Sequence, residues 1–298
     1  MQVELLVDAK ARLGEGVLWC ERTASLYWTD IEGSAISRWR AADGSTQRWN
    51  LPERVGSFAL CAAPSQLLLG LASGVALFNL LTGALTATVA VEPEQPGTRI
   101  NDGRCDAQGR FVFGMFNGAK GSAPIGPIGH FYRVGPRLTV ERLPLPAVAV
   151  ANSIAFSPDG SRMYFTDSPT RRIFSVAYHA DGRIGTPTLF TQLPAGEGDP
   201  DGSAVDANGD LWNAQWDGGC VVRYGADGRE AERIALPVSR PTCPCFGGPQ
   251  LDRMFVTSAR IGLSEAALLQ QPNAGGVFAC SPGVRGLREH RFVTDLLA

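Results

Sequence analysis

Four short motifs place an oxygen-bearing side chain beside a glycine or another small residue. Carboxylate and carboxamide oxygens are ligands for hard divalent cations. Burying two carboxylates near one another without a cation is costly, and a divalent ion removes that cost by balancing both charges. If the motifs meet in space, they predict a site for one divalent metal ion. They are Gly14-Glu15-Gly16, Asn101-Asp102-Gly103, Ala151-Asn152-Ser153 and Pro200-Asp201-Gly202.

The types of ligand indicate a hard ion. Ca²⁺ is the expected ion, and Zn²⁺, Mn²⁺, Mg²⁺ and Fe²⁺ also accept carboxylates in open sites. An alternative interpretation is that these aspartates and asparagines cap loops and fill a wet channel through bridging water molecules. A metal site requires these side chains to converge on one point. The elements that carry them must therefore be predicted next.

An internal repeat places these motifs along the chain. Six strand-like segments rich in aromatic and aliphatic residues follow one another at steps of 41, 44, 52, 48 and 43 residues. Repeats of about 40 to 50 residues are typical of propeller blades. The core positions from which these steps are counted are Leu26, Leu67, Phe111, Met163, Leu211 and Met254.

Each repeat predicts one four-stranded blade. Turn-forming sequences at 106–109, 157–160 and 206–209 precede three of the segments, and further strand-like runs follow every segment. We therefore predict an all-β, six-bladed β-propeller that forms a single domain over residues 1–298. Residues 3–7 supply the strand that closes the last blade. A β-sandwich or a pair of barrels is the alternative, but six equal units are difficult to place in a sandwich.

The innermost strands of the blades line the central channel, so equivalent positions in the six repeats form a ring. Two carboxylates and two carboxamides fall in that ring, which favours the metal site over the wet channel. Cysteines 243 and 245 also lie near the channel, where thiolate ligation is the alternative to an ordinary buried thiol. Counting back 10 or 11 residues from each core position gives Glu15, Ser57, Asn101, Asn152, Asp201 and Cys243.

Charge and composition exclude several classes of partner. A formal net charge of −2 provides no electrostatic footprint for nucleic acid or an anionic membrane, so the expected ligand is a small molecule. Residues 1–8 lack the basic start of a secretory signal, and no stretch has the roughly 18 apolar residues that span a bilayer. Seven scattered cysteines indicate reduced thiols. We expect a cytoplasmic protein that is a monomer or a weak homodimer.

The motifs also resemble those of a known family over essentially the whole chain. The resemblance is to the regucalcin, senescence marker protein (SMP-30) and gluconolactonase family. The motifs are specific together, whereas a single one such as Ser-Pro-Asp-Gly is a common β-turn. They are Leu13-Gly14-Glu15-Gly16, Arg99-Ile100-Asn101-Asp102-Gly103, Asn152-Ser153-Ile154-Ala155, Pro200-Asp201-Gly202-Ser203, and the stretches 244–249 and 275–278.

The resemblance implies a function and a set of roles. It implies a metal-dependent hydrolase that opens a sugar lactone such as gluconolactone, xylonolactone or arabinonolactone. Glu15, Asn152 and Asp201 are the implied metal ligands, and Arg99 and Asn101 the implied substrate contacts. Asp201 is the implied general base. A hydroxide formed on the metal is the alternative nucleophile, because a cation lowers the pKa of an aspartate bound to it.

The sequence leaves alternatives open for the preferred substrate and for the class of reaction. Many relatives carry an acidic residue in the stretch equivalent to 115–120, which here reads Met-Phe-Asn-Gly-Ala-Lys. Another ester or phosphoester hydrolase and a non-catalytic calcium-binding protein remain alternatives. The two carboxylates of the ring favour an enzyme, and the lack of additional histidines or basic residues beside them argues against a phosphoester.

Overall fold

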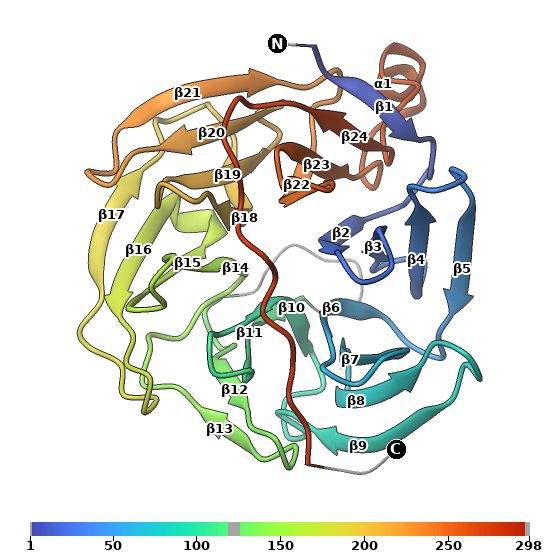
Figure 1. The fold of residues 1–298 in the computed structure, drawn as a ribbon. Helices are drawn as coiled ribbons and strands as arrows, with labels where there is room; N and C mark the ends of the chain where they lie inside the picture. The colour runs from blue at the N-terminus through green and yellow to red at the C-terminus, as the bar shows by residue number, and fades with distance from the viewer. Residues whose placement is uncertain (1, 119–125, 296–298) are drawn as a thin grey trace.

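The computed structural model describes residues 2–118 and 126–295, whose strands form six four-stranded antiparallel sheets around a central axis (Figure 1). This arrangement confirms the predicted six-bladed β-propeller. The first blade consists of β2 (Gly14–Cys20), β3 (Ser25–Asp30), β4 (Ala35–Arg40) and β5 (Thr46–Asn50). The second consists of β6 (Val55–Leu60), β7 (Gln66–Leu71), β8 (Gly74–Asn79) and β9 (Leu85–Ala90). The third consists of β10 (Thr98–Cys105), β11 (Phe111–Asn117), β12 (Phe131–Val134) and β13 (Val140–Arg142).

The remaining three blades follow in chain order, and the N-terminal strand completes the last. The fourth blade consists of β14 (Ala151–Phe156), β15 (Arg162–Asp167), β16 (Arg172–Ala177) and β17 (Thr188–Gln192). The fifth consists of β18 (Asp199–Val205), β19 (Leu211–Trp216), β20 (Cys220–Tyr224) and β21 (Glu230–Ala235). The sixth consists of β22 (Pro241–Gly247), β23 (Arg253–Ser258), β24 (Val277–Cys280) and β1 (Glu4–Val7).

The ring closes through the first strand of the chain. Glu4 and Leu5 of β1 pair with Ala279 and Phe278 of β24, in an antiparallel register. This confirms the predicted role of residues 3–7. Because the outer strand of the last blade comes from the opposite end of the chain, closure holds the two ends of the propeller together and leaves no open blade between them.

The hydrophobic core is divided among the interfaces between neighbouring blades. In one cluster, Phe111 and Phe113 of the third blade pack with Leu68 and Leu77 of the second. Inner strands are accordingly buried along their length, as in β14, whereas residues of the outermost strands, as in β17, are exposed or half-buried. Burial between blades fixes each blade against two others, so positions on the inner strands are held rigidly relative to the axis.

The C-terminal segment crosses one end of the channel. Figure 1 shows this segment, in red, running across the centre of the disc. The amide of Phe292 donates to the carbonyl of Leu60 in the second blade. Arg104, near the end of β10, forms an ion pair with Glu289 at 2.6 Å. The segment thus covers the end of the channel to which the last residues of β10 point.

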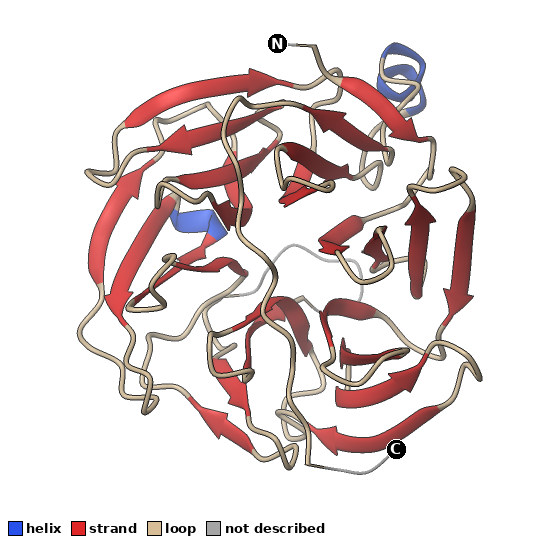
Figure 2. Ribbon diagram, in the orientation of Figure 1, coloured by secondary structure: helices blue, strands red, loops and turns tan. Residues whose placement is uncertain are grey.

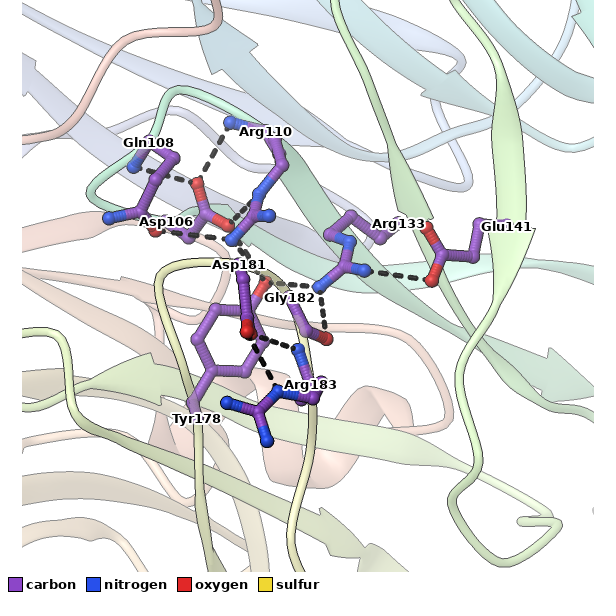
Figure 3. A network of polar contacts seen from close by, with 9 residues as sticks. All are labelled: Asp106, Gln108, Arg110, Arg133, Glu141, Tyr178, Asp181, Gly182 and Arg183. Atoms are coloured by element: carbon purple, nitrogen blue, oxygen red, sulfur yellow. Dashed lines mark hydrogen bonds and ion pairs between the residues drawn. The ribbon is translucent and has the colours of Figure 1, made fainter.

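A buried polar network joins the third and fourth blades (Figure 3). The Tyr178 hydroxyl donates to the Asp106 carboxylate at 2.7 Å, and Arg133 donates to the Tyr178 hydroxyl at 3.1 Å. Arg110 forms an ion pair with the same carboxylate at 2.6 Å, and Arg133 forms one with Glu141 at 2.8 Å. The aspartate predicted from the sequence as a turn residue therefore also binds two blades together.

Helices are a small part of the fold (Figure 2). The short helix α1 (Glu265–Gln270) begins at Ser264, whose side chain accepts a hydrogen bond from the amide of Ala267. A single 3₁₀ turn, η1 (Ser168–Thr170), follows β15. None of the helices within residues 2–118 and 126–295 is long and apolar enough to cross a bilayer.

Close approach of the inner strands requires glycine at position 56. A Cβ at Gly56 would overlap the carbonyl oxygen of Ile100 and lie 2.9 Å from that of Asn101. We expect Gly56→Ala to lower the free energy of unfolding by about 1 to 3 kcal/mol, because the backbone of β10 must move. Chemical denaturation measures the change. Gly97→Ala is the control, since its Cβ meets only the side chain of Asn117 at 3.9 Å. Equal stability of the two variants would contradict this account.

Candidate active site and metal centre

The inner strands share a β-bulge at the height of the predicted site residues. Strand pairing shifts between Glu15 and Leu18 in β2, so two residues there face one residue of β3. The same shift occurs in β10, β14 and β18, between 100 and 103, 152 and 155, and 200 and 203. Bulges redirect side chains and are common beside active sites. Here they turn side chains of four blades toward the channel mouth.

The bulges bring all five predicted site residues to one cavity. Glu15 and Asn152 are the last paired residues before their bulges, whereas Asn101 and Asp201 are the first residues within theirs. This offset explains why the sequence repeat gave steps of both 10 and 11 residues. Together with Arg99, these four residues line a cavity of about 370 Å³.

Two carboxyl groups face each other in the cavity. The Glu15 and Asp201 carboxyls are close enough for each to shift the pKa of the other. Burial, together with the charge of Asp102, raises the pKa of Glu15 to about 8. Burial, together with the charge of Glu15, raises the pKa of Asp201 well above its usual range. Both shifts have the cause expected of carboxylates whose negative charge lacks a compensating cation.

Two asparagines and one arginine form a continuous chain of hydrogen bonds beside these carboxyls. Arg99 Nη1 donates to Asn101 Oδ1 at 2.6 Å. Asn101 Nδ2 in turn donates to Asn152 Oδ1 at 3.1 Å and to the carbonyl oxygen of Ala151 at 2.9 Å. Each amide is therefore held in one orientation, and the contacts join the third blade to the fourth.

Ser168 fixes the orientation of Asn152. The Asn152 Nδ2 donates to Ser168 Oγ at 2.9 Å, and the hydroxyl donates to the carbonyl of Pro200 at 2.7 Å. Because the amide nitrogen is used in this way, the ligand atom is the carbonyl oxygen of Asn152, which accepts one hydrogen bond from Asn101 and keeps a second lone pair. The sequence analysis did not identify this serine. It lies in η1, outside the repeated strands, and a Ser-Pro pair is too common to mark it.

Asp102 was part of a predicted motif but had no assigned role. Its carboxylate accepts hydrogen bonds from the amides of Gly103 and Ile154, both at 2.8 Å. One contact lies within the bulge of β10, and the other reaches the bulge of β14. Asp102 therefore links the two bulges, and its buried charge adds to the electrostatic strain on Glu15 and Asp201.

Arg99 is a buried cation in the cavity wall. It is 4% exposed and stacks on Phe116 with its guanidinium carbon 4.4 Å from the ring centre. Burial and the neighbouring Arg54 lower the pKa of Arg99 to about 10, so it remains charged at neutral pH. Its Nε is buried without a hydrogen-bond partner in the described structure.

Two positions of the predicted ring serve packing instead. The Ser57 hydroxyl donates to the carbonyl of Gly103 at 3.0 Å. Cys243 is 3% exposed, and burial raises the pKa of its thiol, as it does for Cys245. Neither Ser57 nor the two cysteines are among the residues that line the cavity. Their roles agree with the interpretation of both cysteines as buried thiols.

The remaining walls of the cavity are partly aromatic and partly charged. Phe116 of β11 and Trp216 of β19 both line it, as does an ion pair between Glu32 and Arg54 with a separation of 3.2 Å. Phe116 falls in the stretch 115–120, where the sequence lacks the acidic residue of many relatives. Residues 119 and 120 of that stretch lie outside the described residues.

The donor set fits a hard divalent ion. Within residues 2–118 and 126–295, no three His, Cys, Asp or Glu side chains are arranged as a metal site. A divalent ion in this cavity would be held by the carboxylates of Glu15 and Asp201 with a carboxamide. Glu15 and Asp201 supply oxygen donors whose charges would balance such an ion, and the Asn152 oxygen is oriented by Ser168. This set leaves coordination positions for water or substrate.

The chain matches a known family over most of its length. The family model described as the SMP-30/Gluconolactonase/LRE-like region matches residues 13–260. The L-arabinolactonase of Azospirillum brasilense is 50% identical over 98% of this chain and 95% of its own length. The 6-deoxy-6-sulfogluconolactonase of Pseudomonas putida is 35% identical over 97% of this chain and 98% of its own length.

A relative of known structure has nearly the same fold. The crystal structure of the calcium-binding protein regucalcin from Agrobacterium tumefaciens strain C58 has a TM-score of 0.90 and 32% sequence identity. The similarity covers 97% of this chain and 96% of that protein. Sequence, repeat architecture and structure thus agree, and this chain belongs to the SMP-30/gluconolactonase/LRE-like family.

Proposed function

We propose that this protein is a metal-dependent lactonase that hydrolyses the ring ester of a sugar lactone. The observation that carries the proposal is the convergence of two buried carboxyls, an oriented carboxamide and a buried guanidinium on one cavity. The relatives named L-arabinolactonase and 6-deoxy-6-sulfogluconolactonase support the same reaction. Glu15, Asn152 and Asp201 are the metal ligands in this proposal, and Arg99 and Asn101 contact the lactone.

We propose Ca²⁺ as the bound ion. The donors are all oxygen atoms, which suits a hard cation, and the structurally similar regucalcin is a calcium-binding protein. Zn²⁺, Mn²⁺, Mg²⁺ and Fe²⁺ are compatible with the same donors. A titration of metal-free protein with each ion, followed by an activity assay, ranks them.

The reaction breaks the ring C–O bond of the lactone by attack of water on its carbonyl carbon. A divalent ion in this site supplies Lewis-acid polarisation of the carbonyl and stabilises the negative charge that develops on its oxygen. The Asp201 carboxylate takes the proton from the attacking water, and that proton then reaches the oxygen that leaves as the ring opens. The Arg99 guanidinium and the Asn101 side chain contact the lactone oxygens and hydroxyls.

The cavity is suited to a small, largely uncharged substrate. Its volume of about 370 Å³ accommodates a single sugar ring, and its walls combine hydrogen-bonding groups with aromatic rings. Among the sugar lactones, we propose a pentonolactone such as L-arabinonolactone as the preferred substrate, because the relative named L-arabinolactonase is 50% identical. Comparison of kcat/KM for pentono- and hexonolactones measures the preference.

A calcium-binding role without catalysis is the second candidate. It is favoured by the similarity to the calcium-binding regucalcin structure. One experiment separates the two candidates. A pH-indicator assay follows acid release from five- and six-membered aldonolactones, with and without chelator. The proposed lactonase opens at least one of them in a metal-dependent manner, whereas a protein that only binds calcium opens none.

We also propose that the chain works in the cytoplasm as a monomer or a weak homodimer. All seven cysteines are buried and unpaired, which agrees with a reducing compartment. Sedimentation at several protein concentrations measures the state of association.

Removal of the substrate contacts is expected to separate catalysis from metal binding. We expect Arg99→Ala and Asn101→Ala each to lower kcat/KM by roughly tenfold to a hundredfold, because each removes charged or polar contacts to the lactone. Metal affinity should change by less than about threefold, since neither residue is an assigned ligand. Isothermal titration with the metal and steady-state assays with a lactone measure the two quantities. Loss of metal binding in either variant would show that the division of roles is wrong.

A further inference from the structure

One wall of the cavity is held from behind by a residue that does not line it. Trp216 at the end of β19 and Ile261 after β23 both face the cavity. Arg240, in the segment before β22, contacts both of them. Its guanidinium carbon lies 4.8 Å from the centre of the Trp216 ring, and Nη1 donates to the carbonyl oxygen of Ile261.

The guanidinium is itself fixed by a carboxylate. Arg240 Nε and Nη2 donate to the two oxygens of Asp217, at 2.6 and 3.3 Å. This bidentate pairing sets the plane of the guanidinium. The Arg240 side chain is only 16% exposed, so the cation that stacks on the indole is largely shielded from water. A shielded cation–π contact is stronger than an exposed one. The indole plane is therefore fixed without any help from a bound substrate.

The opposite side of the cavity has a different character. Arg54 and Glu32 enter it from the second and first blades, and Trp216 enters from the fifth. The second and fifth blades lie across the propeller axis from one another (Figure 1). The cavity thus has a charged, hydrogen-bonding side at Arg54 and Glu32, and on the fifth blade the flat indole of Trp216 next to the carboxylate of Asp199. A polyhydroxylated ring with one face of carbon-bound hydrogens matches this pattern better than an alkyl ester does.

We propose that Trp216 determines specificity by packing against the carbon-bound hydrogens of the lactone ring, and that Arg240 is the positioning residue that holds the indole in place. This inference rests on the proposed lactonase function and extends it to the orientation of the substrate. The apolar face of the ring lies on the indole, and the hydroxyl groups point toward Arg54. Arg240 does not line the cavity and acts through the indole of Trp216.

Steady-state kinetics with L-arabinonolactone test the proposal. We expect Trp216→Ala to raise KM about tenfold with kcat within about twofold, because ring packing stabilises ground state and transition state alike. Trp216→Phe keeps an aromatic face and should lose less. Arg240→Ala should raise KM in the same direction, and Arg240→Lys should restore part of the loss, since a cation remains beside Asp217.

A double variant distinguishes positioning from a general structural role. If Arg240 acts through the indole, Arg240→Ala adds nothing to the KM of Trp216→Ala. Arg253→Ala is the matched control. Arg253 stacks on Phe255 at 5.4 Å and pairs with Glu4, but none of the three lines the cavity, so KM should not change.

The outcomes separate this inference from the function on which it rests. Two results overturn the inference alone, provided that the wild-type protein is active. One is a KM that Trp216→Ala leaves unchanged. The other is an effect of Arg240→Ala on KM that is equally large in the Trp216→Ala background. A wild-type protein that opens no sugar lactone overturns the proposed function. Thermal unfolding of every variant, with its metal affinity, identifies any KM change that arises from damage to the fold.

Discussion

Asp201→Asn is expected to lower kcat for sugar lactones by roughly 10² to 10⁴ at saturating metal, because a positioned general base contributes that much to the rate. The substitution keeps an oxygen donor of nearly the same shape but removes the negative charge and the basic oxygen. Saturating metal is essential, since reduced occupancy would otherwise resemble lost chemistry. Turnover per metal-loaded chain is the quantity to measure.

Asn152→Ala is the informative comparison for this variant. It removes a neutral ligand whose place water can take, so activity should recover substantially as the metal concentration rises. Asp199→Asn is a matched control, because this carboxylate lies two residues away on β18 and also lines the cavity. Its side chain is 46% exposed and pairs with Arg171 at 3.5 Å, so its loss should matter far less. Full activity of Asp201→Asn at high metal concentration would show that Asp201 is a metal ligand and not the general base.

The double variant Glu15→Gln, Asp201→Asn is expected to lose both metal binding and activity. The wild-type protein should bind about one divalent ion per chain, since the two carboxylates and the carboxamide at the mouth of the channel form one set of oxygen donors. Removing both charges leaves neutral oxygens, which hold a divalent ion weakly. Metal analysis after dialysis, with the lactone assay, measures both losses. Undiminished stoichiometric binding by the double variant would refute the assignment.

Metal binding by the wild-type protein should also release protons. In the metal-free protein burial raises the pKa of Glu15 to about 8, so the pair of carboxyls still holds a proton at pH 7. A divalent ion needs the deprotonated form and must displace that proton. Affinity should therefore rise as pH increases through 8, where Glu15 loses its proton, and should continue to rise above it because the pKa of Asp201 is also raised. Calorimetry in buffers of different ionisation enthalpy counts the protons, and metal binding without proton release at pH 7 would contradict the electrostatic account.

The sequence alone determined the architecture and identified four of the residues that line the cavity. The repeat of aromatic strands at steps of 41 to 52 residues predicted six blades, because each strand type is encoded in a few neighbouring residues. Equivalence of positions in the repeat then brought Glu15, Asn101, Asn152 and Asp201 to one ring. The structure places these four beside one cavity with Arg99. Because the repeat aligns equivalent positions, local sequence patterns predicted which distant residues lie around the same channel.

Only the tertiary structure decided how those residues are oriented and what surrounds them. The repeat aligns all six inner strands, so Ser57 and Cys243 fall in the same ring as the site residues although neither lines the cavity. Ser168, in η1, and Trp216, at the end of β19, reach the cavity from outside the repeated positions. Their roles depend on contacts between blades distant along the chain. Such contacts exist only after the ring has closed, which is why local patterns could not reveal them.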